Sequence, residues 1–286
     1  MSEFTVASLN LCNFAKPPFA SYEWHNILTS EQWTQKRSWL TESIIAADAD
    51  IIAFQEVFSI TELKELCFEL GYHYFICPDR PNIEDDFVFS QPCVAIASRY
   101  KAKWVKIPPK MQSRFARYPA MARVSLPNGA AVTAISVHLK SQRASAAPDN
   151  YTEKQSQLYG QWVSSFQRAD EANALFEIAK KQINKAPVVI MGDFNQSRDS
   201  QSLQGLWKNN LLQPLDTLLG VGPFNTFYHR FTPNAIDHIL ISDRVTAVDM
   251  LCFDDHLPTN GALSSDHAML VGKISVESEV GAGGRQ

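Results

Sequence analysis

The run Val188–Met191 constrains the fold more than any other feature of the sequence. Its four consecutive apolar residues predict a strand that is buried on both faces. Gly192 then lets the backbone approach a neighbour closely, and Asp193 and Asn195 follow at i and i+2, which turns both side chains to one side of an extended chain. Together they offer hard oxygen to a divalent cation or a water. An ordinary Asx turn also contains Asp and Asn. A metal or water site is therefore indicated only if other strand ends supply matching ligands.

Other predicted strands also end on polar residues. Two of them end on Asn10 and Glu56, and a third leads directly into His138. Near the C-terminus, Asp266 and His267 follow two serines between the last two predicted strands. Each residue taken alone is also typical of a turn, a solvated strand end or a helix cap. Their common placement at or near strand ends predicts that they gather into one site.

Asp237 carries a more specific signal. It lies in a strand predicted over Ile236–Ser242, where alternation sends Asp237 and His238 to opposite faces. One of the two polar groups is therefore buried, and a buried carboxylate needs a partner, usually a histidine or a metal. We expect this strand to pair with another predicted over Thr226–Phe231.

The chain is predicted to form one domain over residues 1–277, followed by a disordered Gly-rich tail over residues 278–286. It contains no internal repeat, low-complexity tract or linker. Some strands follow one another directly, and others are separated by helices, the longest predicted over Glu31–Ala47 and Tyr151–Asn184. This order favours a mixed α/β sheet structure over a doubly wound parallel sheet.

Local signals place further boundaries. Ser59 followed by Glu62 predicts a capping box at the start of a short helix. Asn128 and Gly129 predict a hairpin turn, and the acidic, aromatic run Asn82–Phe89 predicts a loop.

Composition narrows the class of protein. The net charge of −4 gives no global attraction to polyanions, so binding of nucleic acid or phosphate requires a local patch. The five cysteines are scattered and form no C-x-x-C pair, which argues against a zinc site or a disulfide scaffold and suits a reducing compartment. No signal peptide and no apolar run of membrane-spanning length are visible. We therefore expect a cytoplasmic protein without stable membrane insertion.

The residue types at the strand ends point to one kind of chemistry. Carboxylates and amides without cysteine suit Mg²⁺ or Mn²⁺ rather than zinc. Two histidines add proton-transfer capacity near neutral pH. A hard metal ion, a histidine and amide donors are what the hydrolysis of a phosphoester requires.

Six motifs occur in the order L-N, Q-E, H-L-K-S, G-D-F-N, I-D-H-I-L and S-D-H. In this order the chain resembles the endonuclease/exonuclease/phosphatase superfamily, the family of DNase I, exonuclease III, the neutral sphingomyelinases and the inositol polyphosphate 5-phosphatases. The resemblance covers nearly the whole chain. It implies a four-layered α/β sandwich of the DNase I type, in which two mixed sheets lie face to face with helices outside and the active site lies at one end.

The resemblance also implies roles for the candidate residues. Glu56 would be the main metal ligand, with Asn10 and Asp266 beside it. Asp193 and Asn195 would orient the attacking water and touch the scissile phosphate. Whether one or two metal ions act is left open.

The remaining motif residues would act around the phosphate. His267 would be the general base or a phosphate contact, and Asp237 would hold it in its tautomer; we place the role of base first. His138 would face the phosphate from the other side and stabilise developing charge. Lys140, in the H-L-K-S motif, and Arg99 are expected to bind substrate.

A basic stretch over residues 99–123 bears on the substrate. It has eight basic side chains and no acidic one, with aromatic residues interleaved. Such a surface suits single-stranded nucleic acid or an anionic membrane face, although a strand edge defended by lysines has the same composition. The basic residues are Arg99, Lys101, Lys103, Lys106, Lys110, Arg114, Arg117 and Arg123.

These observations predict a Mg²⁺-dependent phosphodiesterase that acts on a phosphodiester substrate, with a nuclease as the first choice. The alternative is a phosphatase or phosphodiesterase acting on a small molecule or lipid headgroup, such as an inositol phosphate or sphingomyelin. A catalytically inactive binding module is disfavoured, because every motif position keeps its functional residue type. The 5-phosphatases carry W-C-D-R where this chain has Ala235–His238, which disfavours that subfamily.

Overall fold

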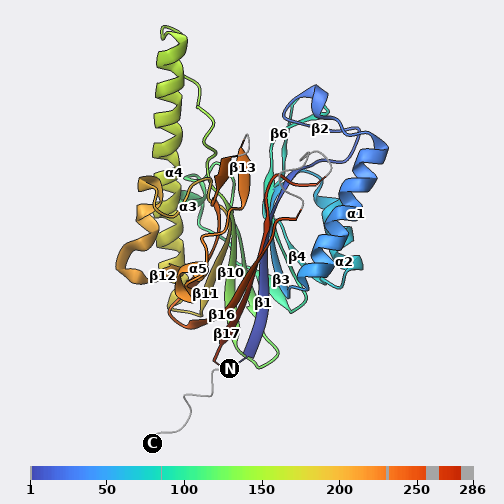
Figure 1. Cartoon of the computed structure of the whole chain (residues 1–286), viewed down its shortest axis with the longest axis vertical. Helices are drawn as coiled ribbons and strands as arrows, with labels where there is room; N and C mark the ends of the chain where they lie inside the picture. The colour runs from blue at the N-terminus through green and yellow to red at the C-terminus, as the bar shows by residue number, and fades with distance from the viewer. Residues whose placement is uncertain (1, 85, 230–231, 256–263, 278–286) are drawn as a thin grey trace, which may run out of the picture.

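Two mixed six-stranded sheets pack face to face at the centre of the protein (Figure 1). The computed structural model describes residues 2–84, 86–229, 232–255 and 264–277. In spatial order, the first sheet consists of β16 (Val245–Phe253), β17 (Met269–Val276), β1 (Ser2–Phe14), β3 (Ile51–Val57), β7 (Cys93–Ser98) and β4 (Tyr74–Ile76). The second consists of β12 (Leu212–Pro214), β15 (Asp237–Ser242), β11 (Val188–Asp193), β10 (Ala131–His138), β9 (Ala120–Ser125) and β8 (Ala102–Trp104).

Helices cover the outer face of each sheet, so the molecule has four layers (Figure 1). The helices α1 (Ser30–Ala47) and α2 (Ile60–Glu69) pack on the first sheet. The long helix α4 (Glu153–Ile183) and the 3₁₀ helix η2 (Gln201–Asn210) pack on the second. The predicted four-layered sandwich is thereby confirmed. In the described ranges, no helix is both long and apolar enough to cross a membrane.

The smaller elements lie at the edges and ends of the sandwich. They are η1 (Trp24–Asn26), α3 (Pro109–Gln112), α5 (Leu215–Leu219), a three-stranded sheet of β2 (Ala20–Ser21), β6 (Val88–Gln91) and β5 (Asn82–Glu84), and a hairpin of β13 (Phe227–His229) and β14 (Thr232–Asn234). The run predicted as a loop over Asn82–Phe89 therefore contains β5 and the start of β6.

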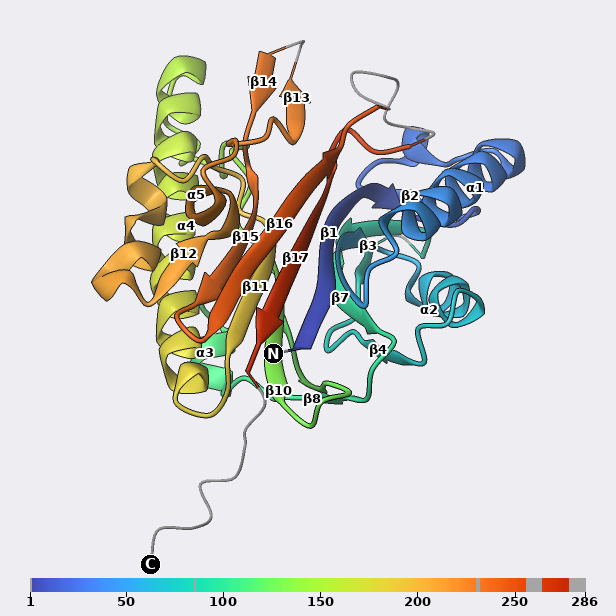
Figure 2. The same ribbon diagram turned by 60° about the horizontal axis from the view of Figure 1, so that its bottom comes forward.

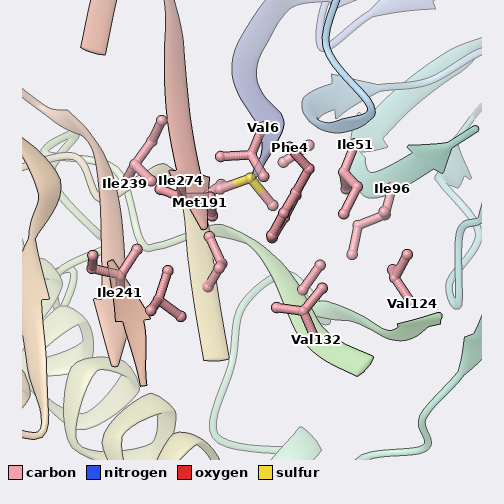
Figure 3. Close-up of a cluster of buried hydrophobic side chains, with 14 of the residues drawn as sticks. Phe4, Val6, Ile51, Ile96, Val124, Val132, Met191, Ile239, Ile241 and Ile274 are labelled. Atoms are coloured by element: carbon pink, nitrogen blue, oxygen red, sulfur yellow. The ribbon is translucent and has the colours of Figure 1, made fainter. Parts of the chain in front are cut away.

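Apolar side chains from the facing sides of the two sheets form the central core (Figure 3). Val6 and Ile51 of the first sheet belong to one buried cluster with Val132, Met191 and Ile239 of the second. Burying each such side chain stabilises the fold by roughly 1.5–3 kcal/mol. Alternate residues of the same strands lie under the helices, so these strands are buried on both faces, as their apolar runs predict.

The C-terminal ends of the central strands lie at one end of the sandwich. β1 and β3 are parallel, as are β10 and β11. Asn10 of β1 contacts Asp193 of β11 at 3.1 Å, and Gln55 of β3 contacts Ser136 of β10 at 3.2 Å, so the two parallel pairs point the same way. Figure 2 shows β16, β17, β1 and β3 side by side in the first sheet.

Two local predictions are wrong. β15 does not pair with the segment predicted over Thr226–Phe231: it lies between β11 and β12, and β13 pairs with β14. Ser59 does not cap α2, because its hydroxyl accepts a hydrogen bond from the backbone N–H of Lys16 at 2.8 Å. Capping boxes occur instead at Thr29 and Thr152, at the start of α1 and α4. The predicted tail over residues 278–286 and Phe231 lie outside the described residues.

Gly192 allows the close backbone approach that the sequence suggests. It pairs with Val137 of β10, and a Cβ atom at this position would lie 2.0 Å from the Val137 carbonyl oxygen. Its φ of +152° is also one that side-chain-bearing residues rarely adopt. Only glycine therefore lets β11 lie against β10 at the point where Asp193 follows.

We expect Gly192→Ala to destabilise the protein by at least about 2 kcal/mol, because the new methyl group clashes with backbone that cannot move aside. The matched control is Gly129→Ala, which has a φ of +84° but open space around its Cβ and should cost only about 1 kcal/mol. Urea denaturation measures both free energies of unfolding. Equal effects of the two substitutions would show that the contact with Val137 does not matter.

Candidate active site

The predicted site residues come from five strands, from the turn that follows β11 and from the segment before β17. Their side chains meet at the end of the sandwich where β1, β3, β10 and β11 finish. The group consists of Asn10, Glu56, His138, Asp193, Asn195, Asp237, Asp266 and His267.

Asp193 lies at the centre of this group and is 2% exposed. The Asn10 side-chain amide donates a hydrogen bond to Asp193 Oδ2 at 3.1 Å, and His138 Nε2 lies 3.3 Å from the same oxygen. His267 Nε2 approaches it to 3.9 Å. The backbone N–H of Asn195 donates to Asp193 Oδ1 at 2.7 Å. One carboxylate thus links both sheets and both histidines.

Asp237 and His267 form a buried pair. Nδ1 of the imidazole lies 2.8 Å from Asp237 Oδ2, and both side chains are almost completely buried. The backbone N–H groups of the two residues are also bound, to the hydroxyls of Thr226 at 3.1 Å and Ser265 at 3.0 Å. Within the described residues, Asp237 Oδ1 is buried and has no hydrogen-bond partner. The pairing directs Nε2 of His267 toward Asp193.

Burial and neighbouring charges shift the pKa values at the site. Burial, and then the charge of Asp237, raise the pKa of Asp193 to about 7. Burial lowers the pKa of His267, but Asp237 and Asp193 outweigh it and bring the value to about 10. Burial lowers the pKa of His138 well below its usual value, and the nearby charges of Arg117 and His267 add to the effect. Near neutral pH, His267 is therefore an imidazolium and His138 is neutral.

Glu56 has backbone strain that is typical of a functional position. Its φ is +57°, in the left-handed region that residues other than glycine rarely adopt. The backbone N–H of Asn13 donates a hydrogen bond to Glu56 Oε2 at 2.9 Å. Asp266 lies beside the paired imidazole, with Oδ1 3.9 Å from His267 Nε2.

Lys36 is a residue of this region that the sequence interpretation missed. Its side chain is 1% exposed, and its ammonium donates hydrogen bonds to the carbonyls of Cys12 at 2.9 Å and Ser264 at 2.6 Å. Burial lowers its pKa, which the charges of Glu56 and Asp266 partly offset. A signal was present, because Lys36 lies three residues after Trp33 on the apolar face of α1.

The donor set suits a hard divalent cation. Oxygen ligands from carboxylates and an amide are available at Glu56, Asp266 and Asn10. The Cys12 thiol lies close to Asp266 and Glu56, but burial, followed by these charges, raises its pKa, so it stays a protonated thiol and not a thiolate ligand. A second acidic group, made of Asp193, Asp237 and His267, brings its ligand atoms within 4.8 Å of one another. In the part of the chain that the structure describes, the buried Oδ1 of Asp237 has no hydrogen-bond partner and so could accept a further donor or a cation.

The two predicted substrate-binding residues lie in different places. Lys140 follows His138, and its ammonium folds back on its own loop, 3.2 Å from the Arg143 carbonyl. Arg99 is not brought to the site: it pairs with Asp48 at 2.7 Å beside the start of β3. Glu56 lies near the other end of that strand, roughly 20 Å away.

The basic stretch over residues 99–123 does not form one surface. Arg114 is paired with Asp170 and Glu177 of α4, and Arg123 hydrogen-bonds Gln182. The lysines of the stretch are exposed along and beyond the edge strand β8. Only Arg117 reaches the site, where its Nη1 donates to the Leu139 carbonyl at 3.0 Å.

Comparison with known proteins agrees with the motifs. The chain matches the model of the Endonuclease/Exonuclease/phosphatase family over residues 7–267. No curated protein sequence matches it.

Solved structures share the fold. A humanized TDP2 of D. rerio has 14% identity and a TM-score of 0.66, covering 96% of this chain and 100% of that chain. An endonuclease/exonuclease/phosphatase from Bacteroides vulgatus has 16% identity and a TM-score of 0.63, covering 97% and 100%. The mannosyl-6-phosphatase Bt3783 of Bacteroides thetaiotaomicron has 19% identity and a TM-score of 0.61, covering 95% and 99%. At these identities the likeness shows the fold alone, and it confirms the predicted DNase I-like sandwich.

Proposed function

The chain belongs to the endonuclease/exonuclease/phosphatase family, whose members hydrolyse phosphoester bonds, and we propose that it is a Mg²⁺- or Mn²⁺-dependent phosphodiesterase. The observation that carries the proposal is the convergence of Asn10, His138, Asn195 and His267 on the buried carboxylate of Asp193. Amide and imidazole groups arranged around one carboxylate suit the activation of a water beside a phosphate.

Glu56, Asn10 and Asp266 would hold the metal ion. The strained backbone of Glu56 supports this assignment, because strain persists where a site requires a fixed geometry. When bound, such an ion polarises a phosphoryl oxygen and stabilises the negative charge that develops on it. Lys36 supports the ligand set from behind by joining the Cys12 and Ser264 carbonyls, which flank Asn10 and Asp266 in the chain.

The raised pKa of His267 supports a role as a phosphate contact over its role as general base. Its Nδ1 is bound to Asp237, and the doubly protonated ring has no lone pair with which to accept a proton. Its Nε2–H can donate to a phosphoryl oxygen. Asp193, with a pKa of about 7, is suited to take the proton of the attacking water near neutral pH. Asn195 and neutral His138 would orient the water and the phosphate.

We propose nucleic acid as the first substrate class. The exposed lysines beside β8 and the placement of Arg117 at the site support it. A further similar structure is that of D. rerio TDP2 complexed with a single-stranded DNA product, so a protein of this fold can bind a polynucleotide. The dispersal of the basic stretch favours the second candidate, a phosphatase acting on a small molecule, as in the mannosyl-6-phosphatase.

Activity should require a hard divalent ion held by Glu56. Excess chelator should abolish hydrolysis of bis-p-nitrophenyl phosphate, and Mg²⁺ or Mn²⁺ should restore it. Glu56→Gln should raise the Mg²⁺ concentration for half-maximal rate by at least about 10-fold. Glu69→Gln, an exposed carboxylate on α2, is the matched control. Full activity in excess chelator would contradict the proposal.

Asp237 and His267 should behave as one unit. His267→Ala should lower kcat by about 10²–10⁴-fold, and adding Asp237→Asn should cost little more. The single Asp237→Asn variant removes the carboxylate that raises the pKa of His267. Activity that needs the imidazolium is present below this pKa and lost above it, so the alkaline limb of the kcat/KM profile should move to lower pH. Fully multiplicative losses in the double variant would exclude the pairing.

If the substrate is a nucleic acid, KM for an oligonucleotide should rise steeply with salt, with a log–log slope of about 0.7 for each contacted phosphate of a single strand. Changing Lys103, Lys106 and Lys110 to Gln should flatten that dependence. A small phosphodiester should show little dependence in either protein.

The control for this series changes Lys180, Lys181 and Lys185 to Gln, which removes the same charge at the other end of the sandwich, where α4 leads into β11. An oligonucleotide slope that is equal in all three proteins would favour a small-molecule substrate.

A further inference from the structure

Four cations gather beside the site, around the loop that follows β10. They are Arg117, Lys140, Arg143 and Arg168. Burial lowers the pKa of Lys140, and the charges of the three arginines lower it further. The charge of Glu171 raises the pKa of Lys140 and partly offsets these effects. Like charges held this close repel one another, and a bound anion would relieve the repulsion.

The inner half of this cluster is fixed by hydrogen bonds. The Glu171 carboxylate accepts from the backbone N–H groups of Ala116 at 2.8 Å and Lys140 at 2.6 Å. Arg168 is 3% exposed and donates to the Lys140 and Ser141 carbonyls at 2.8 and 3.1 Å. Glu171 and Arg168 are therefore used in holding the loop. The cations that remain able to bind an anion are Arg117 and Arg143.

The outer cations of the cluster are Arg117 and Arg143, and the side chain of Tyr22 lies beside them. These three residues are called the outer half below. The Arg143 guanidinium lies 5.9 Å from the centre of the Tyr22 ring, and its backbone carbonyl is held by the Ser164 hydroxyl at 2.7 Å. Arg117 lies close enough to the Tyr22 hydroxyl for its charge to act on the pKa of that group, which it lowers. The Nε of Arg117 is buried and has no hydrogen-bond partner within the described residues.

This outer half lies directly beside the proposed catalytic groups. Burial, followed by the charge of Glu56, raises the pKa of Tyr22 to about 12, so Tyr22 is close to that carboxylate and its hydroxyl keeps its proton. The charge of Arg117, which lies just before β9 in the same sheet as β10, acts on His138. The Leu139 carbonyl that Arg117 binds also accepts from the Asn195 side chain at 3.0 Å. The cluster therefore borders the position of the scissile phosphate on the side of the β10 loop.

We propose that Arg117, Arg143 and Tyr22 form a subsite for a second phosphoryl group of the substrate, adjacent to the one that is hydrolysed. The proposal rests on the proposed function, because the first phosphoryl group occupies the site around Asp193. Planar guanidinium groups bind phosphate through paired hydrogen bonds, and a tyrosine hydroxyl supplies a further donor. The neighbouring phosphate of a nucleic acid strand and the terminal phosphate of a small bisphosphate have this chemistry in common.

Calorimetry can test the subsite without turnover. Thymidine 5′-phosphate and thymidine 3′,5′-bisphosphate differ by one phosphoryl group, and their affinities are compared with Ca²⁺ in place of Mg²⁺. The wild-type protein should bind the bisphosphate about 10- to 100-fold more tightly, the range for hydrogen bonds to charged groups. Arg143→Ala should reduce this ratio toward one, as should Tyr22→Phe in part. Arg244→Ala, an arginine beyond the other end of β15 that binds the Ile183 carbonyl, should keep the wild-type ratio.

A third ligand distinguishes the two sources of the second phosphate. The dinucleotide pdTpdT presents it as an internal diester, and tighter binding of pdTpdT than of the bisphosphate would indicate a strand. The reverse order would indicate a small bisphosphate. Equal affinities for the monophosphate and the bisphosphate in the wild-type protein, or an unchanged ratio in Arg143→Ala, would overturn the subsite.

Hydrolysis of thymidine 5′-(4-nitrophenyl phosphate) with Mg²⁺ is measured separately on the same wild-type sample. Its absence would contradict the proposed phosphodiesterase function, whereas the binding ratio would still decide the subsite. Failure of the subsite with hydrolysis intact would leave the proposed function standing.

Discussion

The buried carboxylate of Asp193 is the constraint on which the site depends. It ends β11 at the point where Gly192 has brought that strand against β10, and it receives a hydrogen bond from Asn10 across the gap between the two sheets. A buried charge of this kind is costly unless donors surround it. The amide of Asn10, the backbone of Asn195 and the imidazole of His138 supply them. The contact between the sheets and the candidate chemistry are therefore the same interaction.

The charges around the site give Asp193, His138 and His267 different protonation states near neutral pH. The pair of Asp237 and His267 retains a proton, and the same Asp237 charge contributes to the raised pKa of Asp193. Burial, followed by the charges of Arg117 and His267, lowers the pKa of His138, which stays neutral, and within the described residues its Nδ1 has no hydrogen-bond partner. A carboxylate that titrates near neutral pH between an imidazolium and a neutral imidazole is a suitable arrangement for moving one proton beside a phosphate.

Cations lie on two sides of this acidic centre and differ in purpose. Lys36 lies behind Glu56, and its ammonium donates hydrogen bonds to two backbone carbonyls. It therefore stabilises the backbone around the proposed metal ligands and adds a positive charge there. Arg117 and Arg143 lie in front, near Tyr22, and keep donor capacity. A protein with a net charge of −4 thus concentrates positive charge at one place beside the site, where a polyphosphorylated substrate would meet it.

Local patterns in the sequence predicted a mixed sheet structure, the strands that carry Asn10, Glu56 and Asp193, and the burial of Asp237, whereas the sandwich was implied by the family resemblance. Apolar runs and period-2 alternation carry this information within a few residues, and the family resemblance lies in the order of the motifs. Which strands lie side by side is a long-range property that no short window contains, and so the position of β15 between β11 and β12 was missed.

Long-range strand order also explains why the basic residues of the stretch 99–123, which look equivalent in the sequence, lie in different places in the structure. Strand order and direction put Arg99 near the start of β3, far from Glu56, and carry Arg117 to the end of the sandwich beside His138. Tertiary packing likewise turned Lys36, on the apolar face of a helix, into a neighbour of the proposed metal ligands. The sequence specified the reactive groups, and the packing of the two sheets decided which charges surround them, because electrostatic partners are set by distance in space.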